Sequence, residues 1–331
     1  MKPWLWLPAQ QAHDWAPSLI NLYASFSGVR DCNWRQFEWR GMKFRNRLGI
    51  AGGVDKDGLA FQSWIKLGAG FVEVGTVTPK PQGPNTGPTV GRDIDNRALW
   101  NKLGFPSRGA EFVKKNLAGL TARSNPGARD PVPVFVNIGK NRETKLEDAG
   151  GDYASLVREF TGIADTFVVN ISSPNTQDLR NLQGREYLSG LLKQVLAART
   201  DNTPVLLKLS PDLTDGELEE ILNTSLEEGI DGWILTNTTR ERPSGIDFPK
   251  DGGLSGAPLG KQSRICLEKT VKILGPRRGG RLIVSAGGVM SATDVSGRLE
   301  LGADLVQVYS ALIFSGPRLF GDIARILRYR K

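Results

Sequence analysis

Histidine and cysteine are almost absent from this chain of 331 residues, which has one histidine, His13, and two cysteines, Cys32 and Cys266. A single histidine excludes most histidine-based metal sites and argues against a Ser-His-Asp triad. Two cysteines cannot form a disulfide framework or a cysteine-rich zinc site, so we expect a reducing compartment. The sequence also lacks an apolar run near the ~18 residues of a membrane span, and it shows no signal-peptide pattern.

Positive charge is in excess, because 43 Lys and Arg residues stand against 35 Asp and Glu residues, a net charge of +8. This charge is compatible with nucleic acid, an anionic membrane or anionic small molecules, and it does not choose among them. The sequence carries no nucleic-acid-binding motif, so nucleic acid is not an expected partner. The length allows two domains or one large α/β barrel.

Tryptophan is concentrated at the amino-terminal end, where five of the eight tryptophans lie within the first forty residues. Apolar residues recur there at helical spacing between Ala12 and Phe26, and Pro17 predicts a break or a short first helix. This apolar face could pack on the rest of the protein. It could also lie on a membrane surface, where Trp and Tyr suit the boundary between lipid and water.

Short apolar runs alternate with amphipathic segments after residue 45. The predicted strands are 48–51, 71–78, 134–139, 167–172, 205–209, 232–237, 282–286 and 305–309. The predicted helices are 59–67, 110–120, 153–163, 187–198, 215–227, 261–273, 292–301 and 318–329. Eight strands, each followed by a helix, predict a (β/α)8 TIM barrel over residues 41–331, preceded by a small helical segment over residues 1–40. A doubly wound sheet is the alternative.

Two connections are too long to be turns: residues 79–133 after the second predicted strand and 240–258 after the sixth. Both leave from the carboxyl ends of strands, where barrel enzymes place their active sites. We therefore expect binding loops or lids.

Polar side chains follow the predicted strands at these ends, and Asp55 is the only carboxylate among them. The absence of facing carboxylates argues against glycoside hydrolysis, and the absence of a His/Asp/Glu cluster argues against metal-assisted hydrolysis. Asn137, Asn170 and Asn237 follow three different strands. Their amides suit a flat heterocycle whose edge alternates C=O and N–H groups.

Phosphate and charge recognition are indicated at the last strands. Gly287-Gly288 and Tyr309-Ser310 occupy the usual phosphate-binding position of a barrel, and Ser255-Gly256 could add donors. Lys208 allows three interpretations: an amine that forms a Schiff base, a cation that stabilises charge on an electron-accepting ring, or the partner of a carboxylate.

Eight motifs together resemble one family. They are Ala-Gly-Gly-Val-Asp-Lys-Asp-Gly, Val-Glu-Val-Gly-Thr-Val-Thr-Pro-Lys-Pro-Gln, Asn-Ile-Gly-Lys-Asn, Asn-Ile-Ser-Ser-Pro-Asn-Thr, Lys-Leu-Ser-Pro-Asp-Leu, Thr-Asn-Thr-Thr, Gly-Gly-Leu-Ser-Gly and Leu-Val-Gln-Val-Tyr-Ser. In this order they look like dihydroorotate dehydrogenase of the quinone-dependent, membrane-associated class. The resemblance implies an FMN-containing barrel that oxidises dihydroorotate to orotate in pyrimidine (UMP) synthesis.

The resemblance also implies roles for single residues. Ser173 matches the catalytic base that removes the C5 proton, while a hydride passes from C6 to FMN N5; Thr176 and Phe105 surround the outlet for that proton. His13 and Arg92 match the quinone channel, which the N-terminal helices form in this class. Substrate contacts are implied for Lys56, Asn101, Lys102, Leu103, Gly104, Phe105, Asn170, Asn175, Asn237 and Thr238. Flavin contacts are implied for Ala51, Gly52, Gly53, Lys56, Thr76, Asn137, Asn170, Lys208, Thr236, Ser255, Gly256, Gly287, Gly288, Tyr309 and Ser310.

The chain departs from the family pattern in three places. Pro106-Ser107 stands where Asn is common, Pro-Thr-Val-Gly precedes Arg92 where a more basic and aromatic stretch is expected, and Gly52 stands where Ala is usual.

The resemblance implies dihydroorotate, orotate and a membrane quinone as ligands, an anionic membrane surface as a partner, and a monomer. The expected location is peripheral, on the cytoplasmic side of the inner membrane, because a long mitochondrial presequence is not seen. Two alternatives stay open: a Schiff-base lyase that uses Lys208 on a phosphorylated substrate, and a module that binds lipid or nucleic acid through the net charge of +8.

Overall fold

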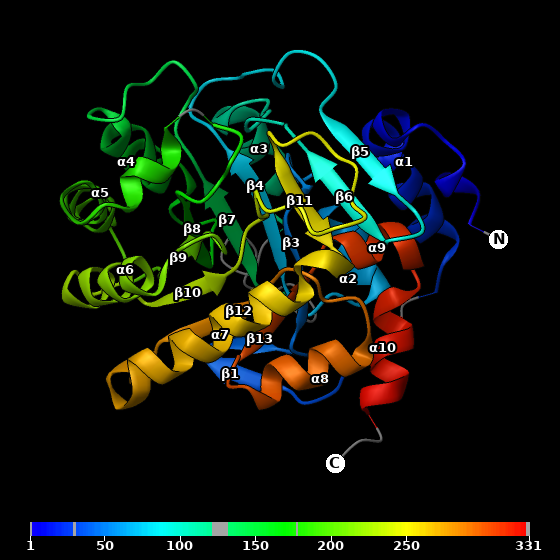
Figure 1. The fold of residues 1–331 in the computed structure, drawn as a ribbon. Helices are drawn as coiled ribbons and strands as arrows, with labels where there is room; N and C mark the ends of the chain where they lie inside the picture. Colours follow the sequence, from blue (N-terminus) through cyan, green and yellow to red (C-terminus); the bar gives the residue numbers. More distant parts are fainter. Residues whose placement is uncertain (1, 29–30, 121–131, 177, 329–331) are drawn as a thin grey trace.

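Eight parallel strands close into a barrel in the computed structural model, which describes residues 2–28, 31–120, 132–176 and 178–328 (Figure 1). Neighbouring strands pair in the order β10-β12-β13-β3-β4-β7-β8-β9. Their bounds are β3 (Leu48–Asp55), β4 (Val72–Val77), β7 (Val134–Ile138), β8 (Thr166–Asn170), β9 (Val205–Leu209), β10 (Gly232–Leu235), β12 (Leu282–Ser285) and β13 (Leu305–Val308). The predicted (β/α)8 barrel is confirmed, and the alternative of a doubly wound sheet is wrong.

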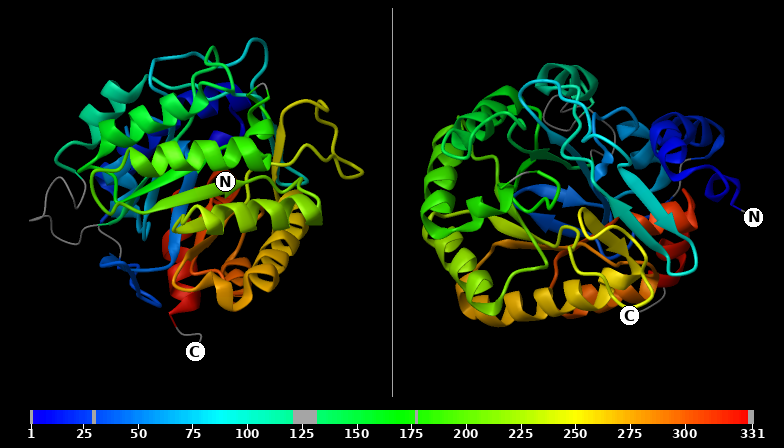
Figure 2. Two further views of the ribbon diagram at one scale, coloured as in Figure 1. Left: turned by 90° about the vertical axis from the view of Figure 1, so that its left-hand side faces the viewer. Right: turned by 45° about the horizontal axis from the view of Figure 1, so that its top comes forward.

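Helices surround the barrel as an outer ring (Figure 2). They are α2 (Phe61–Leu67), α3 (Ala110–Leu117), α4 (Ala149–Phe160), α5 (Arg185–Ala197), α6 (Asp215–Glu227), α7 (Gly260–Leu274), α8 (Ala292–Glu300), α9 (Ser310–Ser315) and α10 (Leu319–Leu327). Every predicted helix is present. The helix predicted at 215–227 has the predicted ends, the others differ at one or both ends, and the last predicted residue, Tyr329, lies outside the described residues. The short α9 was not predicted. Apolar side chains of strands and helices form the large core between the two layers.

The amino-terminal end of the barrel interior is filled with aromatic and aliphatic side chains. Phe71 and Phe135 lie with ring centroids 5.0 Å apart, and Phe44 contacts both rings edge-on. Phe44 belongs to an antiparallel hairpin of β1 (Phe37–Trp39) and β2 (Met42–Phe44), which the sequence analysis did not predict. The hairpin closes this end of the barrel (Figure 1).

The barrel interior changes from apolar to polar within two residues along the strands. Because side chains two residues apart point to the same face of a strand, the next inward position lies one layer closer to the carboxyl end. The apolar residue and its polar successor are Phe71 and Glu73, Phe135 and Asn137, Val168 and Asn170, Leu206 and Lys208, and Leu305 and Gln307. The carboxyl half of the barrel is therefore a buried polar surface on an apolar base.

The two long connections meet in one small sheet above the carboxyl end of the barrel. Its antiparallel strands are β5 (Val90–Asp93), β6 (Ala98–Asn101) and β11 (Gly253–Gly256), in the order β11-β6-β5 (Figure 1). Gly253 of the second connection pairs with Asn101 of the first. The long connections were expected at this end, and their pairing with each other is a tertiary feature.

The first helix, α1, runs without interruption from Ala9 to Phe26 and contains Pro17. The predicted break at Pro17 is therefore wrong. Tertiary contacts hold the helix on both sides of the proline, which compensates for the backbone hydrogen bond that proline removes. Gln10 accepts a hydrogen bond from Thr89 at 2.8 Å, and Asn21 donates to the Leu59 carbonyl at 3.0 Å.

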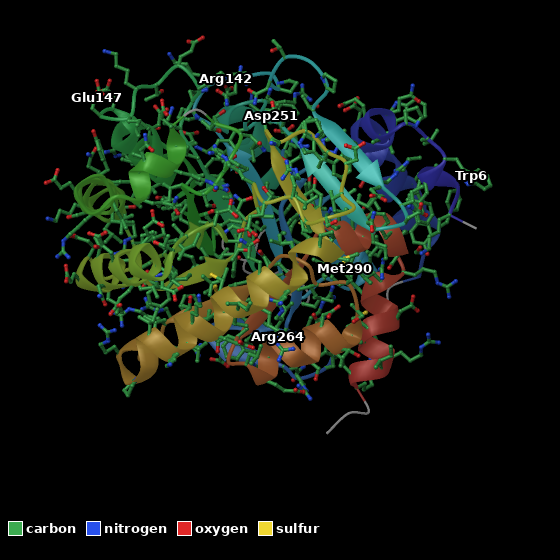
Figure 3. All side chains as sticks on the ribbon, viewed as in Figure 1. Trp6, Arg142, Glu147, Asp251, Arg264 and Met290 are labelled. Carbon is green, nitrogen blue, oxygen red and sulfur yellow. The ribbon has the colours of Figure 1, made fainter. Side chains whose placement is uncertain are left out.

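The apolar face of α1 is divided between protein and solvent. Ala24 is buried, and Ile20 and Tyr23 pack against the core. Other large side chains are exposed: Trp15 by 54%, Leu22 by 58% and Phe26 by 85%. Trp6, which directly follows the short 3-10 helix η1 (Pro3–Leu5), projects from the same end of the molecule and is 71% exposed (Figure 3). Within the described ranges, no helix has both the length and the apolar character to cross a bilayer.

Candidate active site

A cavity opens at the carboxyl end of the barrel and encloses about 980 Å³ of space, its mouth included. Most predicted site residues line it: Ala51, Gly52, Gly53, Lys56, Thr76, Asn101, Leu103, Gly104, Phe105, Asn170, Ser173, Asn175, Lys208, Thr236, Asn237, Thr238, Ser255, Gly287, Gly288, Tyr309 and Ser310. The lining also includes Pro106, Leu259, Ala286, Val289 and Gln307, which were not predicted. Residues from both long connections and from most of the strand ends thus meet in one space.

Six predicted residues lie outside the lining. Asn137 is fully buried one layer behind it, and Lys102 pairs with Asp251 at 2.7 Å near the small sheet. Gly256 has a φ of 92°, and a Cβ there would lie 2.1 Å from the Arg97 carbonyl oxygen, so a side chain does not fit. Thr176 is buried on the loop after β8 that also carries Ser173, called the serine loop below. His13 belongs to α1, and Arg92 of β5 contacts the N-terminal segment.

The carboxylate of Glu73 is the centre of the polar layer. It is completely buried, and its Oε1 accepts hydrogen bonds from Lys208 Nζ at 2.9 Å and Asn137 Nδ2 at 2.5 Å. Its Oε2 accepts from Gln307 Nε2 at 2.5 Å. Glu73 was not among the predicted site residues, although an acidic residue within the apolar run of β4 was a signal that could have indicated it.

Lys208 is therefore an ammonium group held by a carboxylate, one of its three predicted interpretations. A Schiff base requires the free amine, so this arrangement does not favour the lyase alternative. The fixed positive charge borders the cavity, where it can stabilise negative charge on a bound ring.

Asparagine side chains extend the network from Glu73 to the substrate side of the cavity. Asn170 Nδ2 donates to Thr76 Oγ1 at 3.0 Å and to Asn137 Oδ1 at 3.3 Å. Asn237 Nδ2 donates to Ser172 Oγ at 3.0 Å. The hydrogen bonds fix which edge of each amide faces the cavity.

A second amide pair, Asn175 and Asn101, bridges the serine loop and the small sheet. Asn175 Nδ2 donates to Asn101 Oδ1 at 2.6 Å, and Asn101 Nδ2 donates to the Gly253 carbonyl at 3.4 Å. The small sheet thereby positions one wall of the cavity.

Ser173 lies on the loop after β8 and is only 5% exposed. Its Oγ accepts a hydrogen bond from the backbone N–H of Asn175 at 3.2 Å. The Oγ1 atom of nearby Thr176 is buried and has no partner within the described part of the chain. The serine hydroxyl is thus oriented by the backbone and shielded from bulk water.

A glycine cradle follows β12. Gly287 and Gly288 have φ angles of 92° and 67°, and a Cβ on Gly288 would lie 2.2 Å from Gly260 Cα at the start of α7. Ser255 and Ser310 complete the surroundings with their hydroxyl oxygens 3.0 Å apart. Only glycine allows this close approach, and exposed backbone N–H groups with hydroxyls suit a phosphate.

Lys56 joins the cavity to the N-terminal segment. Its Nζ lies 2.6 Å from His13 Nε2. Burial, assisted by the charge of Lys56, lowers the pKa of His13 to about 3, so the imidazole is neutral and accepts this hydrogen bond. Burial also lowers the pKa of Lys56 to about 8. The predicted quinone-channel histidine and a predicted substrate lysine are direct partners.

Arg92 anchors the start of the chain to the small sheet. Its Nη2 donates to the carbonyls of Leu5 and Leu7, both at 2.7 Å.

Asp55 has a structural role, because its carboxylate accepts hydrogen bonds from the backbone N–H groups of Leu59 and Ala60 before α2. Burial raises the pKa of Asp55 to about 6.

Two of the three departures from the family pattern, at Ser107 and Gly52, have local explanations. Ser107 Oγ accepts from the Gly109 N–H at 3.1 Å and so orders the turn before α3, and Pro106 lines the cavity. A Cβ at Gly52 would lie 2.4 Å from Glu73 Oε1. Glycine at position 52 therefore leaves room for the Glu73 network.

Buried polar atoms without partners indicate where a ligand would bind. Asn175 Oδ1, Thr238 Oγ1 and Gln307 Oε1 are buried and unpaired among the described residues, and all three belong to residues that line the cavity. Such atoms are costly unless a ligand or water satisfies them. The described residues contain no group of three or more His, Cys, Asp or Glu side chains that could hold a metal ion.

Comparisons with known proteins agree with this geometry. A family model described as dihydroorotate dehydrogenase matches residues 36–330. A relative named dihydroorotate dehydrogenase (quinone) from Parvibaculum lavamentivorans is 45% identical over 294 residues, 88% of this chain and 81% of its own. A relative with the same name from Brucella melitensis is 43% identical over 296 residues, 86% of this chain and 78% of its own. A crystal structure of DHODH from Eimeria tenella in complex with ferulenol superposes with a TM-score of 0.88 at 32% identity, covering 96% of this chain and 90% of that one.

The Glu73–Lys208 pair provides a test of the buried network. Glu73→Gln is expected to lower the free energy of unfolding by about 3–5 kcal/mol, because it leaves a buried ammonium without its carboxylate. The double variant Glu73→Gln/Lys208→Met should recover much of that loss, since it removes both charges. Urea unfolding measures both values.

The control for this test is Glu111→Gln in the exposed Glu111–Lys115 pair, which should leave the unfolding midpoint unchanged. The cycle is completed by Lys208→Met alone. If the losses of Glu73→Gln and Lys208→Met simply add in the double variant, the two side chains are not coupled, and the network is misassigned.

Proposed function

Because the chain belongs to the dihydroorotate dehydrogenase family, we propose that it catalyses the quinone-dependent oxidation of dihydroorotate to orotate with FMN as its cofactor. The chain is an oxidoreductase of pyrimidine biosynthesis. One observation carries the proposal: the glycine cradle, the Lys208–Glu73 pair and the asparagine amides surround a single cavity.

The cavity suits a flavin mononucleotide by the chemistry of its lining. Gly287, Gly288, Ser255, Gly256 and Ser310 would hold the phosphate through backbone N–H groups and hydroxyls. The ring would lie among Ala51–Gly53, Thr76, Lys208 and the amides of Asn137 and Asn170, with Thr236 and Tyr309 beside it. When bound, FMN would supply a ring that accepts the C6 hydride at N5 and then yields two electrons to the quinone.

Substrate recognition is assigned to the amide side chains of the cavity. Dihydroorotate carries alternating C=O and N–H groups, which Asn101, Asn170, Asn175 and Asn237 can bind from both sides. The Lys56 ammonium would pair with the substrate carboxylate, and Thr238 Oγ1 offers an unpaired hydroxyl. Lys102, Leu103, Gly104 and Phe105 would cover the substrate from the first long connection.

Ser173 is the proposed general base for the C5 proton. A hydroxyl is a weak base, so it needs a fixed geometry and an outlet for its proton. The Asn175 N–H, which donates to Ser173 Oγ, would stabilise the charge that develops on this oxygen. The proton would leave past Thr176 and Phe105.

The N-terminal segment, residues 1–40, is the proposed route for the quinone to the barrel of residues 41–331. His13 and Arg92 would line this route, and the His13–Lys56 hydrogen bond connects it to the cavity. The exposed aromatic side chains of this segment support a peripheral position on a membrane surface. The cytoplasmic side of the inner membrane is the proposed location. The net charge of +8 is compatible with binding to anionic lipids. We also propose that the protein is a monomer.

Ser173→Ala tests the base. The variant should keep bound flavin but lose dihydroorotate oxidation by roughly 10²–10⁴-fold at neutral pH, because a methyl group cannot accept the C5 proton. Stopped-flow bleaching of the flavin absorbance by dihydroorotate measures this half-reaction directly. Near-wild-type bleaching by Ser173→Ala would contradict the assignment.

Lys56 predicts a pH dependence of ligand binding. Its pKa of about 8 means that the ammonium predominates below pH 8 and is lost above it, while His13, with a pKa of about 3, stays neutral throughout. The Kd of the carboxylate ligand orotate should therefore rise about tenfold between pH 7 and 9.

Lys56→Arg serves as the matched variant, because a guanidinium does not titrate in this range. Its orotate Kd, read from the flavin absorbance, should stay level between pH 7 and 9. The proposed Lys56–carboxylate contact is wrong if wild type and Lys56→Arg show the same pH profile.

The exposed face of α1 predicts membrane binding. Replacing Trp15, Leu22 and Phe26 together by serine should reduce co-sedimentation with vesicles of anionic and zwitterionic phospholipid by about tenfold or more, since it removes the apolar area available for insertion. Flavin bleaching by dihydroorotate should remain unchanged. Tyr187→Ser on α5, whose side chain is 51% exposed, is the control. Equal vesicle binding by the triple variant and wild type would rule out this face.

A further inference from the structure

A buried arginine lies directly behind the glycine cradle. Arg298 of α8 is 4% exposed. Its Nη2 donates to the Gly260 carbonyl at 2.9 Å, to Ser263 Oγ at 2.7 Å and to the Gly287 carbonyl at 3.2 Å. Its Nη1 donates to Ser285 Oγ at 3.2 Å. One guanidinium thus connects the end of β12 with the start of α7.

Arg298 forms no ion pair among the residues that the structure describes. Asp294, an acidic residue on the same helix, instead accepts from the Met290 N–H and from Ser291 Oγ. A buried guanidinium without a carboxylate partner is unfavourable, because its desolvation is compensated only by neutral acceptors. Burial accordingly lowers the pKa of Arg298 to about 10, which still leaves it charged at neutral pH.

The hydrogen bonds of Arg298 do not by themselves require a charge. Ser263 Oγ lies 2.6 Å from the Gly287 carbonyl oxygen and 3.2 Å from the Gly260 carbonyl oxygen, so its one hydroxyl proton already serves one of these two acceptors. A neutral donor could satisfy the remaining acceptors without burying a cation. What Arg298 adds to this position is a positive charge beneath the cradle.

The Gly287–Gly288 peptide connects this charge to the cavity. Arg298 holds the Gly287 carbonyl, and in a trans peptide the N–H of the next residue points the opposite way. The Gly288 N–H therefore faces away from the guanidinium, and Gly288 lines the cavity. A phosphate dianion bound there would accept a hydrogen bond from the Gly288 N–H, with the Arg298 guanidinium on the far side of the same peptide.

We propose that Arg298 is a positioning and specificity residue for the phosphate end of the cofactor, which favours a phosphorylated flavin over an unphosphorylated one. The inference rests on the proposed function, because it takes FMN as the occupant of the cavity. The phosphate would supply the ion-pair partner that Arg298 lacks among the described residues, and Coulomb attraction is strong where water is excluded.

Flavin titrations of the apoprotein test this assignment without any turnover. The Kd values of FMN and riboflavin are measured by quenching of flavin fluorescence for wild type, R298Q and R298K. R298Q should lose about tenfold of its preference for FMN over riboflavin, a change of about 1.4 kcal/mol. Its riboflavin Kd should change little. R298K, which keeps the charge, should retain most of the preference.

Two further variants complete the test. R278Q removes a half-buried arginine that binds the Gly302 carbonyl and Asp304, away from the cavity lining, and should leave the preference unchanged. S285D places a carboxylate beside Arg298 and should reduce the preference in the same direction as R298Q, so the test does not depend on R298Q folding.

The outcomes separate this inference from the proposed function. Equal loss of FMN and riboflavin affinity in R298Q, or an unchanged preference in R298Q and S285D, overturns the role of Arg298. A loss of preference in R298K as large as in R298Q overturns the role of its charge. Wild-type apoprotein that binds neither flavin would contradict the proposed cofactor instead.

Discussion

The polar half of the barrel depends on the hydrogen bonds that the buried carboxylate of Glu73 accepts. Three side chains from three other strands, Asn137, Lys208 and Gln307, donate to its two oxygens. Each donor would be costly to bury alone. The Lys208 side chain balances the charge of the carboxylate, and the two amides complete its hydrogen bonds. Because Asn137 in turn receives a hydrogen bond from Asn170, the orientation of the amides that face the cavity follows from this one carboxylate.

Stability and chemistry are separated along the barrel axis. The aromatic layer around Phe71 and Phe135, closed by the β1–β2 hairpin, supplies dry packing at the amino end. The next inward-facing residues along the strands are polar, and this apolar layer lies directly beneath them. The small sheet then covers the opposite end, so that the polar layer lies between an apolar floor and a roof formed by the two long connections.

The N-terminal helix has two different sides, and this explains its composition. Its inner side makes directed contacts with the barrel: His13 meets Lys56, and Asn21 bonds the Leu59 carbonyl. Its outer side presents Trp15, Leu22 and Phe26 to solvent. The single histidine of the chain is thus a neutral acceptor for Lys56, which lines the cavity. The helix that carries the exposed apolar side chains therefore contacts a cavity residue directly.

The sequence by itself determined the eight-stranded barrel and most of the cavity lining. Buried parallel strands are local apolar runs, and the rule that carboxyl ends meet at one face locates the residues that follow them. Tertiary structure alone decided the pairing of the two long connections, the continuity of α1 through Pro17, and the partners of Lys208, Lys56 and Arg298. Glu73 and Lys208, for example, are 135 positions apart and yet hydrogen-bonded at 2.9 Å. Such contacts depend on how distant segments come together in space, which the local periodicity of a sequence does not encode.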